Sequence, residues 1–315
     1  MFLDRMRARF GRRAPVLLVL LACAATALSG CGAGPSQAGA AAIVGGRAVS
    51  LADVQATVDA GLRQPEVQSL MTAQGVSPAD VARFVVSRQV QHLLLAEQAA
   101  RDGIKVDDDQ VSAELAKPSS HALLVNKLAF DPQSARDTMR DELLAEALAA
   151  RYLDQLTVTL DMVRSTSKDD ALVAARQLAA GPAQAKALLA ARGVNALPAQ
   201  QLRAAQQPQN ATRFLFGTPA GQIVVVQVAE SPDEWLVVRV TNRTTAPPPP
   251  GGPAASVVPR LDDATKDSIG RRLTQPLADE LGVRINPRYG VWDPLTLSVV
   301  EPGKQAGMVL PAQLS

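Results

Sequence analysis

The sequence holds few of the residues that most often carry catalysis or metal binding. Among its 315 residues are two cysteines, Cys23 and Cys31, two histidines, His92 and His121, and only 3% aromatic residues. Because both cysteines lie near the N-terminus, no disulfide framework and no thiolate nucleophile is expected in the rest of the chain. Metal sites need clustered ligands, and the sequence has no glycine-rich phosphate loop and no serine-nucleophile elbow. We therefore expect no catalytic residue, no metal and no cofactor.

The charge balance gives no reason to expect a nucleic-acid partner. The whole chain carries 32 basic and 30 acidic residues, a net charge of +2. Residues 1–30 contain five arginines and one aspartate, so the chain without them has 27 basic and 29 acidic residues and a net charge of −2. A nearly neutral chain with few aromatic side chains lacks both the basic patch and the stacking platforms that nucleic-acid binding uses.

The first 31 residues have the layout of an export signal. Five arginines precede an apolar run over residues 14–28, and small residues follow. That order is typical of a cleaved signal peptide. The string Leu-Ser-Gly-Cys, which ends at Cys31, resembles the lipobox of bacterial lipoproteins. The resemblance implies cleavage before Cys31, diacylation of its thiol, and an extracytoplasmic protein that a lipid anchors to the cell membrane.

Two other interpretations of this segment are an uncleaved transmembrane helix and plain secretion with a chance cysteine. The apolar run is roughly 15 residues long, whereas a helix that crosses the hydrocarbon core needs about 20. The pair Arg12-Arg13 also raises twin-arginine export, although the residues after the pair fit that signal poorly. The export route therefore stays open.

Composition and turn signals divide the chain into seven segments. The predicted segments are a signal peptide (1–30), a small-residue tether (31–40), a helical domain (41–157) completed by 261–294, a small α+β domain (158–245), a Pro/Gly linker (246–260) and a tail (295–315). The tail contains Pro302-Gly303 and Pro311, from which we expect a loose end.

Helix start and stop signals are clear in the first half. Ser50 and Ser77 are each followed three residues later by an aspartate, which is typical of helix N-caps. Gly103 is placed to end the helix that Ser77 begins, and Asp107 to cap the next one. The acidic run from Asp107 to Asp109 is interpreted as a cap with solvated first-turn acids. In the second half, residues 222–228 and 234–240 predict an antiparallel hairpin, and one helix bent at Pro276 is expected over residues 261–281.

The order of these elements resembles the N-terminal domain of SurA-type and PrsA-type extracytoplasmic chaperones. The resemblance rests on a short strand, a capped helix, a long helix that ends in the sequence Arg-Asp-Gly-Ile-Lys-Val-Asp-Asp (101–108), and a further long helix. In that family a parvulin domain is inserted, and a late helix and strand return to complete the helical domain. Residues 261–286 look like this returning piece, with Ile285 pairing with the 43–49 segment. Residues 286–294 look like the closing motif of actinobacterial lipoproteins of this group. The implied fold is α+β and mostly helical, with an inserted parvulin-like domain.

The inserted segment departs from the parvulin pattern at the residues that matter for catalysis. Parvulins place a histidine on the first strand and another on the last strand, both beneath the prolyl ring. Here the first strand contains Asp161 and the last contains Trp235, and neither contains a histidine. We interpret Asp161 as a polar residue on the strand face, His92 as a helix residue and His121 as a loop residue. Prolyl isomerisation is not expected.

These observations favour a chaperone-like lipoprotein that binds unfolded or exported polypeptides without isomerising them. An apolar groove in the helical domain would hold client segments, with Met71, Met139 and Met162 available for adaptable packing. Trp235 and Trp292 are interpreted as core anchors. A scaffold lipoprotein that docks one dedicated envelope partner and a residual prolyl isomerase are the alternatives. The oligomeric state stays open.

Overall fold

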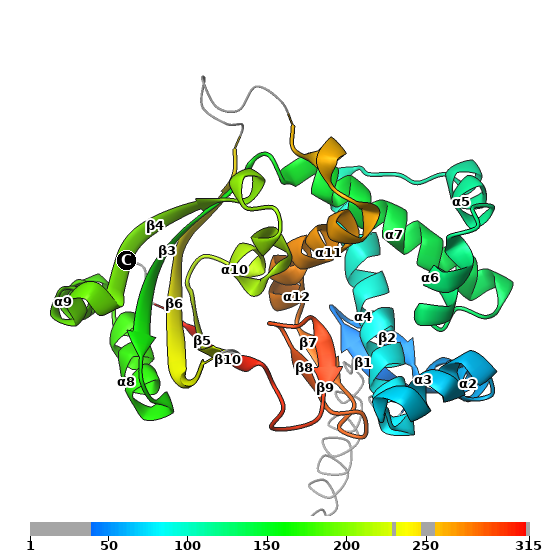
Figure 1. Cartoon of the computed structure of the whole chain (residues 1–315), viewed down its shortest axis with the longest axis horizontal. Coiled ribbons are helices and arrows are strands. Elements are labelled where there is room, and N and C mark those ends of the chain that lie inside the picture. Colours follow the sequence, from blue (N-terminus) through cyan, green and yellow to red (C-terminus); the bar gives the residue numbers. More distant parts are fainter. Residues whose placement is uncertain (1–38, 229–230, 247–255, 313–315) are drawn as a thin grey trace, which may run out of the picture. The chain divides into compact units, whose positions relative to one another are not determined.

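The structure, a computed structural model, has one part built mainly of helices and another built around a five-stranded sheet (Figure 1). It describes residues 39–228, 231–246 and 256–312. Cys31 and most of the predicted linker, residues 247–255, lie outside the described residues. Both parts belong to one compact unit. The fold is therefore α+β, as the sequence predicts.

The helical part comprises eight of the described helices and one small sheet. The helices are α2 (Leu51–Leu62), α3 (Pro65–Gln74), α4 (Pro78–Asp102), α5 (Asp108–Leu115), α6 (Ser120–Asn126), α7 (Pro132–Tyr152), α11 (Asp263–Leu273) and α12 (Gln275–Leu281). The sheet has strands β1 (Ala40–Val44), β2 (Arg47–Ser50) and β7 (Val283–Ile285) in the order β2-β1-β7. Strand β7 pairs antiparallel with β1, with Ile285 opposite Ala42. The predicted return of the late strand to the first one is confirmed, although Ile285 itself pairs one residue before the predicted 43–49 segment.

Local capping explains why the longest helix, α4, begins and ends where it does. The Ser77 hydroxyl accepts a hydrogen bond from the backbone N–H of Asp80, and the Asp80 carboxylate accepts one from the backbone N–H of Ser77. This capping box satisfies donors that a helix start leaves free. Gly103 follows the helix in the left-handed conformation, at φ 65°, which glycine adopts without steric cost. Asp107 caps α5 in the same way, together with Gln110.

The returning helix is two helices rather than one bent helix. Thr274 separates α11 from α12, and Pro276 lies at the start of α12, where a missing backbone N–H costs nothing. Helix α11 packs against α7 at Gly270. A Cβ atom built on Gly270 would lie 1.9 Å from the carbonyl oxygen of Ala145, so only glycine allows the two backbones to approach this closely.

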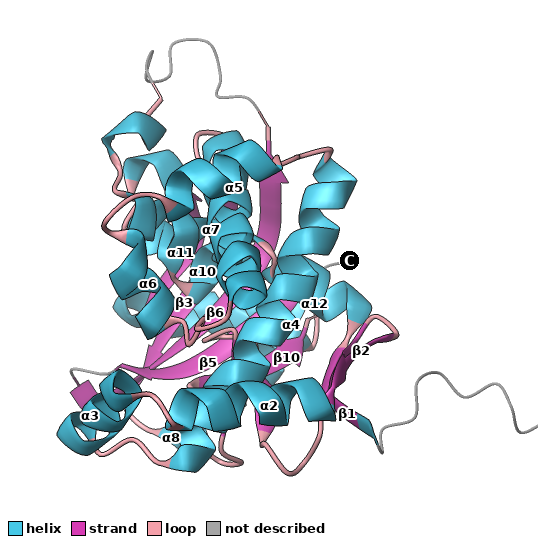
Figure 2. Ribbon diagram, turned by 90° about the vertical axis from the view of Figure 1, so that its right-hand side faces the viewer, coloured by secondary structure: helices cyan, strands magenta, loops and turns pink. Residues whose placement is uncertain are grey.

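The sheet part has α8 (Lys168–Ala179) and α9 (Pro182–Arg192) on one face of the sheet and the short helix α10 (Phe214–Gly217) on the other. Its strands are β3 (Leu156–Ser165), β4 (Ala196–Arg203), β5 (Gln222–Val228), β6 (Ser231–Thr245) and β10 (Gly307–Pro311), in the order β10-β5-β6-β3-β4. Strands β5 and β6 form the predicted antiparallel hairpin. Seen from the helical side, the helices lie in front of this sheet (Figure 2).

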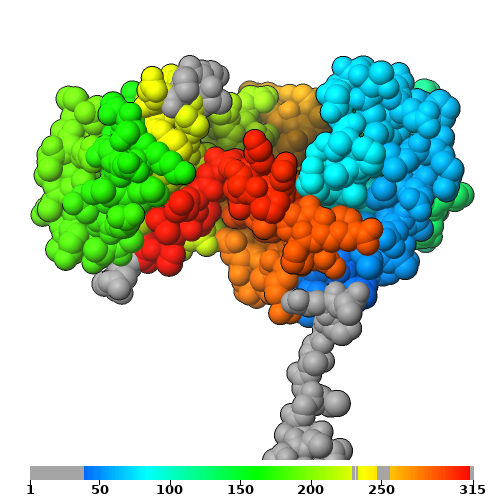
Figure 3. Space-filling model, turned by 90° about the horizontal axis from the view of Figure 1, so that it is seen from below, coloured from blue at the N-terminus to red at the C-terminus, as the bar shows by residue number. Residues whose placement is uncertain are grey.

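The expectation of a loose C-terminal tail is wrong. Strands β8 (Val291–Asp293) and β9 (Ser298–Val300) form a hairpin beside α4, where the Ser87 hydroxyl accepts a hydrogen bond from the backbone N–H of Val299 at 2.7 Å. Strand β10 then pairs antiparallel with β5 along its whole length. Figure 3 shows this C-terminal segment in red, running over the surface to the sheet part. Five consecutive residue pairs between β10 and β5 hold the segment in place, despite its prolines.

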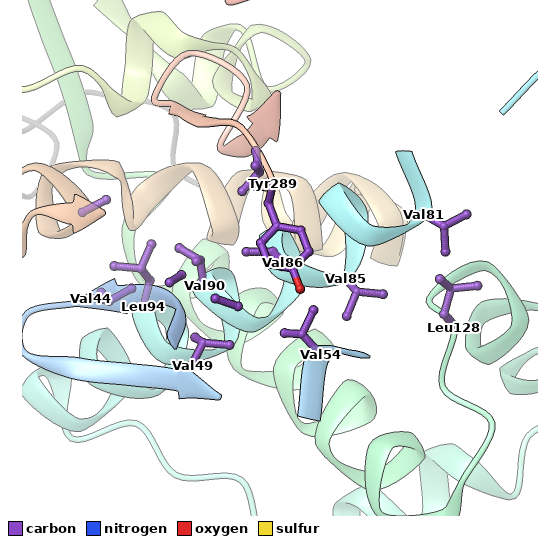
Figure 4. Packing of buried hydrophobic residues seen from close by; sticks show 14 of the residues in the cluster. Val44, Val49, Val54, Val81, Val85, Val86, Val90, Leu94, Leu128 and Tyr289 are labelled. Carbon is purple, nitrogen blue, oxygen red and sulfur yellow. The ribbon is translucent and has the colours of Figure 1, made fainter. Parts of the chain in front are cut away.

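Two hydrophobic clusters decide how the parts hold together. The first lies within the helical part, where Tyr289 points in among the valines of α4 (Figure 4). The second is shared: Leu148 of α7 and Ile269 of α11 pack with Leu160 of β3 and Phe216 of α10, all fully buried. The sheet part and the helical part therefore have a common core.

Candidate functional site

An apolar groove opens between α3, the start of α4 and the end of α6. It encloses about 390 Å³ and is lined mainly by aliphatic and aromatic side chains. The lining residues are Val67, Leu70, Met71, Gln74, Val76, Asp80, Val81, Phe84, Val125, Asn126 and Leu128. Leu70 and Phe84 are each 39% exposed, and they are the exposed large hydrophobic side chains among the described residues of the helical part. The apolar groove is therefore where this part presents apolar surface to solvent.

Helix capping and one half-buried arginine position the walls of the apolar groove. Pro65 begins α3, and Gly75, at φ 66°, ends it, so the chain turns back at once into α4. On the opposite wall, the Arg88 guanidinium donates hydrogen bonds to the carbonyl oxygen of Lys127 and to the hydroxyl of Thr138. These bonds fix the end of α6 against α4 and α7. The three walls are thus held by their own local structure and do not need a ligand to form.

The apolar groove continues past Phe84 into a polar cavity of about 460 Å³, because Asp80 and Phe84 line both. Behind this cavity lies a network of buried charges. The Glu142 carboxylate accepts a hydrogen bond from the Arg271 guanidinium at 2.7 Å and forms an ion pair with the Lys127 ammonium at 3.0 Å. Burial opposes ionisation of Glu142, but Arg271 and Lys127 outweigh it and hold the pKa of this carboxyl below its usual range. The opposite charges nearly cancel, so we assign no charge preference to the polar cavity.

The face of the sheet that α7, α10 and α11 cover is mainly apolar at β3 and β6. On this face β3 contributes Leu160 and Met162, and β6 contributes Leu236 and Val238. Leu160 and Val238 are fully buried in the shared core beneath α7, α10 and α11. Within the described residues neither strand carries a histidine; the ionisable side chains on this face include Arg164, opposite Leu236, and Arg243, which donates a hydrogen bond to the carbonyl oxygen of Phe216.

Asp161 is a polar residue on a face of β3, as predicted, and the structure shows that it is buried in an ion pair. Asp161 lies on the opposite face, buried, where its carboxylate accepts hydrogen bonds from Arg239 at 2.6 and 2.9 Å. Its second oxygen accepts the backbone N–H of Ala199 at 2.8 Å. The Asp161–Arg239 pair joins the neighbouring strands β3 and β6 and is a structural ion pair. Its signal in the sequence was an aspartate and an arginine at inward positions of two apolar strands.

Neither histidine lies on the sheet: both are on helices of the helical part. His92 lies on α4, as predicted, and its Nδ1 contacts the Asp141 carboxylate at 2.8 Å. The hydrogen bond to Asp141 raises the pKa of His92, although burial opposes the shift. His121 is exposed on helix α6, so its interpretation as a loop residue is wrong. No group of three or more His, Cys, Asp or Glu side chains within the described ranges is arranged to hold a metal ion.

Other predicted residues have the structural roles expected of them. Asp107 caps α5, and Asp108 forms an exposed ion pair with Arg140 at 2.6 Å. Trp235 packs against the cluster beneath α8, and Trp292 packs against the core of the helical part. Of the three methionines, Met71 lines the apolar groove, Met139 is buried in the core, and Met162 is partly buried against the shared core.

Comparison with protein families decides the relationship. The model of the SurA-like N-terminal domain matches residues 2–159, which is half of the chain. The chain belongs to this family. The SurA-type resemblance predicted from the element order is confirmed. The match ends inside β3, so it contains the whole apolar groove and stops where the sheet part begins.

Solved structures give weaker comparisons. The foldase protein PrsA from Lactococcus lactis is 12% identical, with 79% of this chain and 95% of that chain covered and a TM-score of 0.23. PrsA from Streptococcus pneumoniae is 11% identical, with 78% and 94% covered and the same TM-score. Scores this low carry no argument about fold or function. No curated protein matches the chain. Among the helices within the described ranges, none has the length and apolarity to cross a membrane.

Sequence reasoning predicted a groove and one of its walls, α4, but not the other two helices that form it. Helices α3 and α6 were not identified, although Pro65 at the first helical position and Gly75 after the last one are signals for α3. Helix α6 has seven residues and no side-chain cap, so its sequence carries little to find it by. Cys31, the predicted lipidation site, lies outside the described residues.

Proposed function

We propose that the protein is a lipid-anchored, extracytoplasmic chaperone that holds unfolded exported polypeptides and does not isomerise prolyl bonds. The observation that carries the proposal is the apolar groove within the SurA-like region, with Leu70 and Phe84 exposed along it. Apolar grooves between helices bind segments whose own apolar side chains would otherwise face water. Membership of the SurA-like family supports a chaperone-type function.

The expected contribution of the groove follows from the exposure of its two main side chains. Full burial of a Leu or Phe side chain is worth about 1.5–3 kcal/mol. Because each is 39% exposed, a bound client would gain about 1 kcal/mol from covering each one. Replacing both with serine should therefore weaken client binding about tenfold or more.

The experiment compares suppression of aggregation by three lipid-free chains that begin at residue 32. They are the wild type, Leu70→Ser with Phe84→Ser, and Val173→Ser as the matched control, because Val173 is 46% exposed on α8, away from the groove. We expect the wild type and the control to hold a denatured exported protein equally well, and the groove variant to need about ten times the concentration. Failure of the wild type to suppress aggregation at equimolar ratio would refute the proposal.

The absence of isomerase activity rests on the apolar sheet face with Leu160 and Val238. The rate of cis–trans conversion of a proline tetrapeptide should equal the uncatalysed rate; a clear acceleration would overturn this part. The anchor rests on Cys31. Cys31→Ser should move the protein from the membrane fraction to the soluble fraction after export, whereas Ser29→Ala should not. A single stoichiometric partner in a pull-down, in place of many exported clients, would favour the scaffold alternative.

A further inference from the structure

Arg243 is a half-buried cation without an acidic partner. It lies near the end of β6, and its Nε donates a hydrogen bond to the carbonyl oxygen of Phe216 at 3.1 Å. Its two terminal nitrogens have no acceptor among the described residues. The buried Arg239 differs, because it pairs with Asp161. The half-buried guanidinium of Arg243 therefore keeps four N–H donors in the fixed fork that matches a carboxylate.

Burial has a measurable consequence for Arg243. It lowers the pKa of the guanidinium to about 10. The interaction that opposes this shift is with Tyr152, a phenol whose own pKa is raised above its usual value by burial and by the hydrogen bond to Asp102. A desolvated cation is unfavourable unless a counter-charge compensates it. Within the described structure, the chain does not supply that counter-charge.

Arg243 lines a cavity of about 280 Å³ where the helical part meets β6. The other lining residues are Gln98, Arg101, Tyr152, Thr245, Leu273, Pro276, Leu277 and Glu280. Leu273, Pro276 and Leu277 give the cavity an apolar side, next to the guanidinium. Such a combination fits a ligand with one polar end and one aliphatic end.

The other charges around the cavity limit the ligand to a single negative charge. Arg101 is already neutralised, because it donates to Glu97 at 3.0 Å and to both oxygens of Glu280 at 2.9 Å. Tyr152 donates its hydroxyl to Asp102 at 2.7 Å. One unpaired cation faces the cavity, while Glu280 on the rim repels further negative charge. A phosphate dianion therefore fits less well than a carboxylate.

We propose that this cavity binds a carboxylate carried by a short aliphatic group, with Arg243 as its bidentate partner and Leu273 and Leu277 against the aliphatic end. The C-terminus of a polypeptide that ends in an aliphatic residue and a free branched carboxylic acid share this chemistry. The cavity is separate from the apolar groove, so the proposal does not depend on the chaperone function.

Calorimetric titration of the lipid-free chain at low ionic strength tests the proposal. The probes are an acetylated tetrapeptide that ends in leucine with a free carboxylate, the same peptide as its carboxamide, and isovalerate. We expect the free peptide to bind at least about tenfold more tightly than the carboxamide, because a hydrogen bond to a charged group is worth about 1.5–3 kcal/mol. Binding of isovalerate as well would identify a free acid as sufficient, and binding of the peptide alone would identify a polypeptide terminus.

Three variants complete the test. Arg243→Gln should lose the preference for the carboxylate, and Arg176→Gln, which removes the same charge from an exposed position on α8, should not. Arg243→Gln also removes the hydrogen bond to Phe216, so a second variant that leaves Arg243 in place is needed. Thr245→Trp serves this purpose, because Thr245 is exposed at the cavity and the indole should block the entry of the probe. Equal binding of the acid and the amide, no binding of any probe to the wild type, or unchanged binding by Thr245→Trp would overturn the proposal.

Discussion

Replacing Asp161 with alanine should destabilise the protein strongly, because it leaves Arg239 charged and unpaired in the core. The side chains of Asp161 and Arg239 are only 6% and 10% exposed, and two hydrogen bonds join them. Removing one partner of a buried ion pair costs about 3–5 kcal/mol. Loss of the hydrogen bond from Ala199 adds little to this cost, because Ala199 is exposed and its N–H can bond to water instead. We expect a loss of about 3–5 kcal/mol in the free energy of unfolding.

The double variant Asp161→Val with Arg239→Met should behave differently. Buried ion pairs replaced by apolar residues of similar volume are often neutral or more stable. Val163, Val237 and Leu178 already make the surroundings apolar. The double variant should therefore lie within about 1 kcal/mol of the wild type, and the coupling energy from the double-mutant cycle should be about 3 kcal/mol or more.

The assay is urea unfolding followed by the fluorescence of Trp235, which lies opposite Ser165 in the β3–β6 pairing. A Trp292→Phe background removes the second tryptophan. Glu234→Ala is the control, because its pair with Arg164 is long, at 3.6 Å, and exposed; it should cost less than about 1 kcal/mol. If Asp161→Ala costs no more than this control, or if the double variant is as unstable as the single one, the structural role of the pair is refuted.

Two further predictions concern the helical part. Gly270→Ala should lower the free energy of unfolding by about 2–3 kcal/mol or more, because its Cβ would collide with the Ala145 carbonyl. The control Ser268→Ala, on the exposed side of α11, should have little effect on the thermal midpoint. Equal thermal midpoints for the two variants would contradict the close approach of α11 to α7. Burial, together with the nearby charge of Asp263, raises the pKa of Glu146 from 4.5 to about 7. Between these two pH values the folded protein holds a proton that the unfolded chain releases. The free energy of unfolding should therefore fall as the pH rises from about 4.5 to about 7. Glu146→Gln should abolish that fall, so its thermal midpoint should exceed that of the wild type increasingly across this range and by a constant amount above it. A wild-type midpoint independent of pH between about 4.5 and about 7 would contradict the shift.

Local signals predicted the helical part well. Ser77 with Asp80, Gly103 and Asp107 each act within four residues of their own position, so the sequence alone contains the interaction. The return of residues 283–285 to β1 was predictable only through the family resemblance, since no local pattern specifies a partner about 240 residues away. Helix α6 shows the limit of local signals, because its seven residues have no side-chain cap.

Long-range contacts account for the rest. The sequence Gly-Met-Val-Leu-Pro of β10 contains a glycine and a proline, which indicate a turn or a loose end, and only the free edge of β5 makes it a strand. Asp161 and Arg239 lie on separate strands, 78 residues apart, and become partners only when β3 pairs with β6. The shared core beneath α10 likewise depends on where α11 returns. In each case tertiary packing specifies the partner, which the periodicity of one segment does not reveal.

The order of the strands in the two sheets has a consequence for biosynthesis. A chain leaves the ribosome from its N-terminus. Three early elements nevertheless pack against late ones: β1 pairs with β7, α7 packs against α11, and β5 pairs with β10. Until residues beyond 260 are available, the apolar sides of α4 and α7 lack the part of their cover that α11, α12 and the β8–β9 hairpin supply, and closing such distant pairs is intrinsically slow. The newborn protein therefore spends time as an open chain with exposed apolar helices. During that interval it is itself the kind of molecule that its mature apolar groove is proposed to hold.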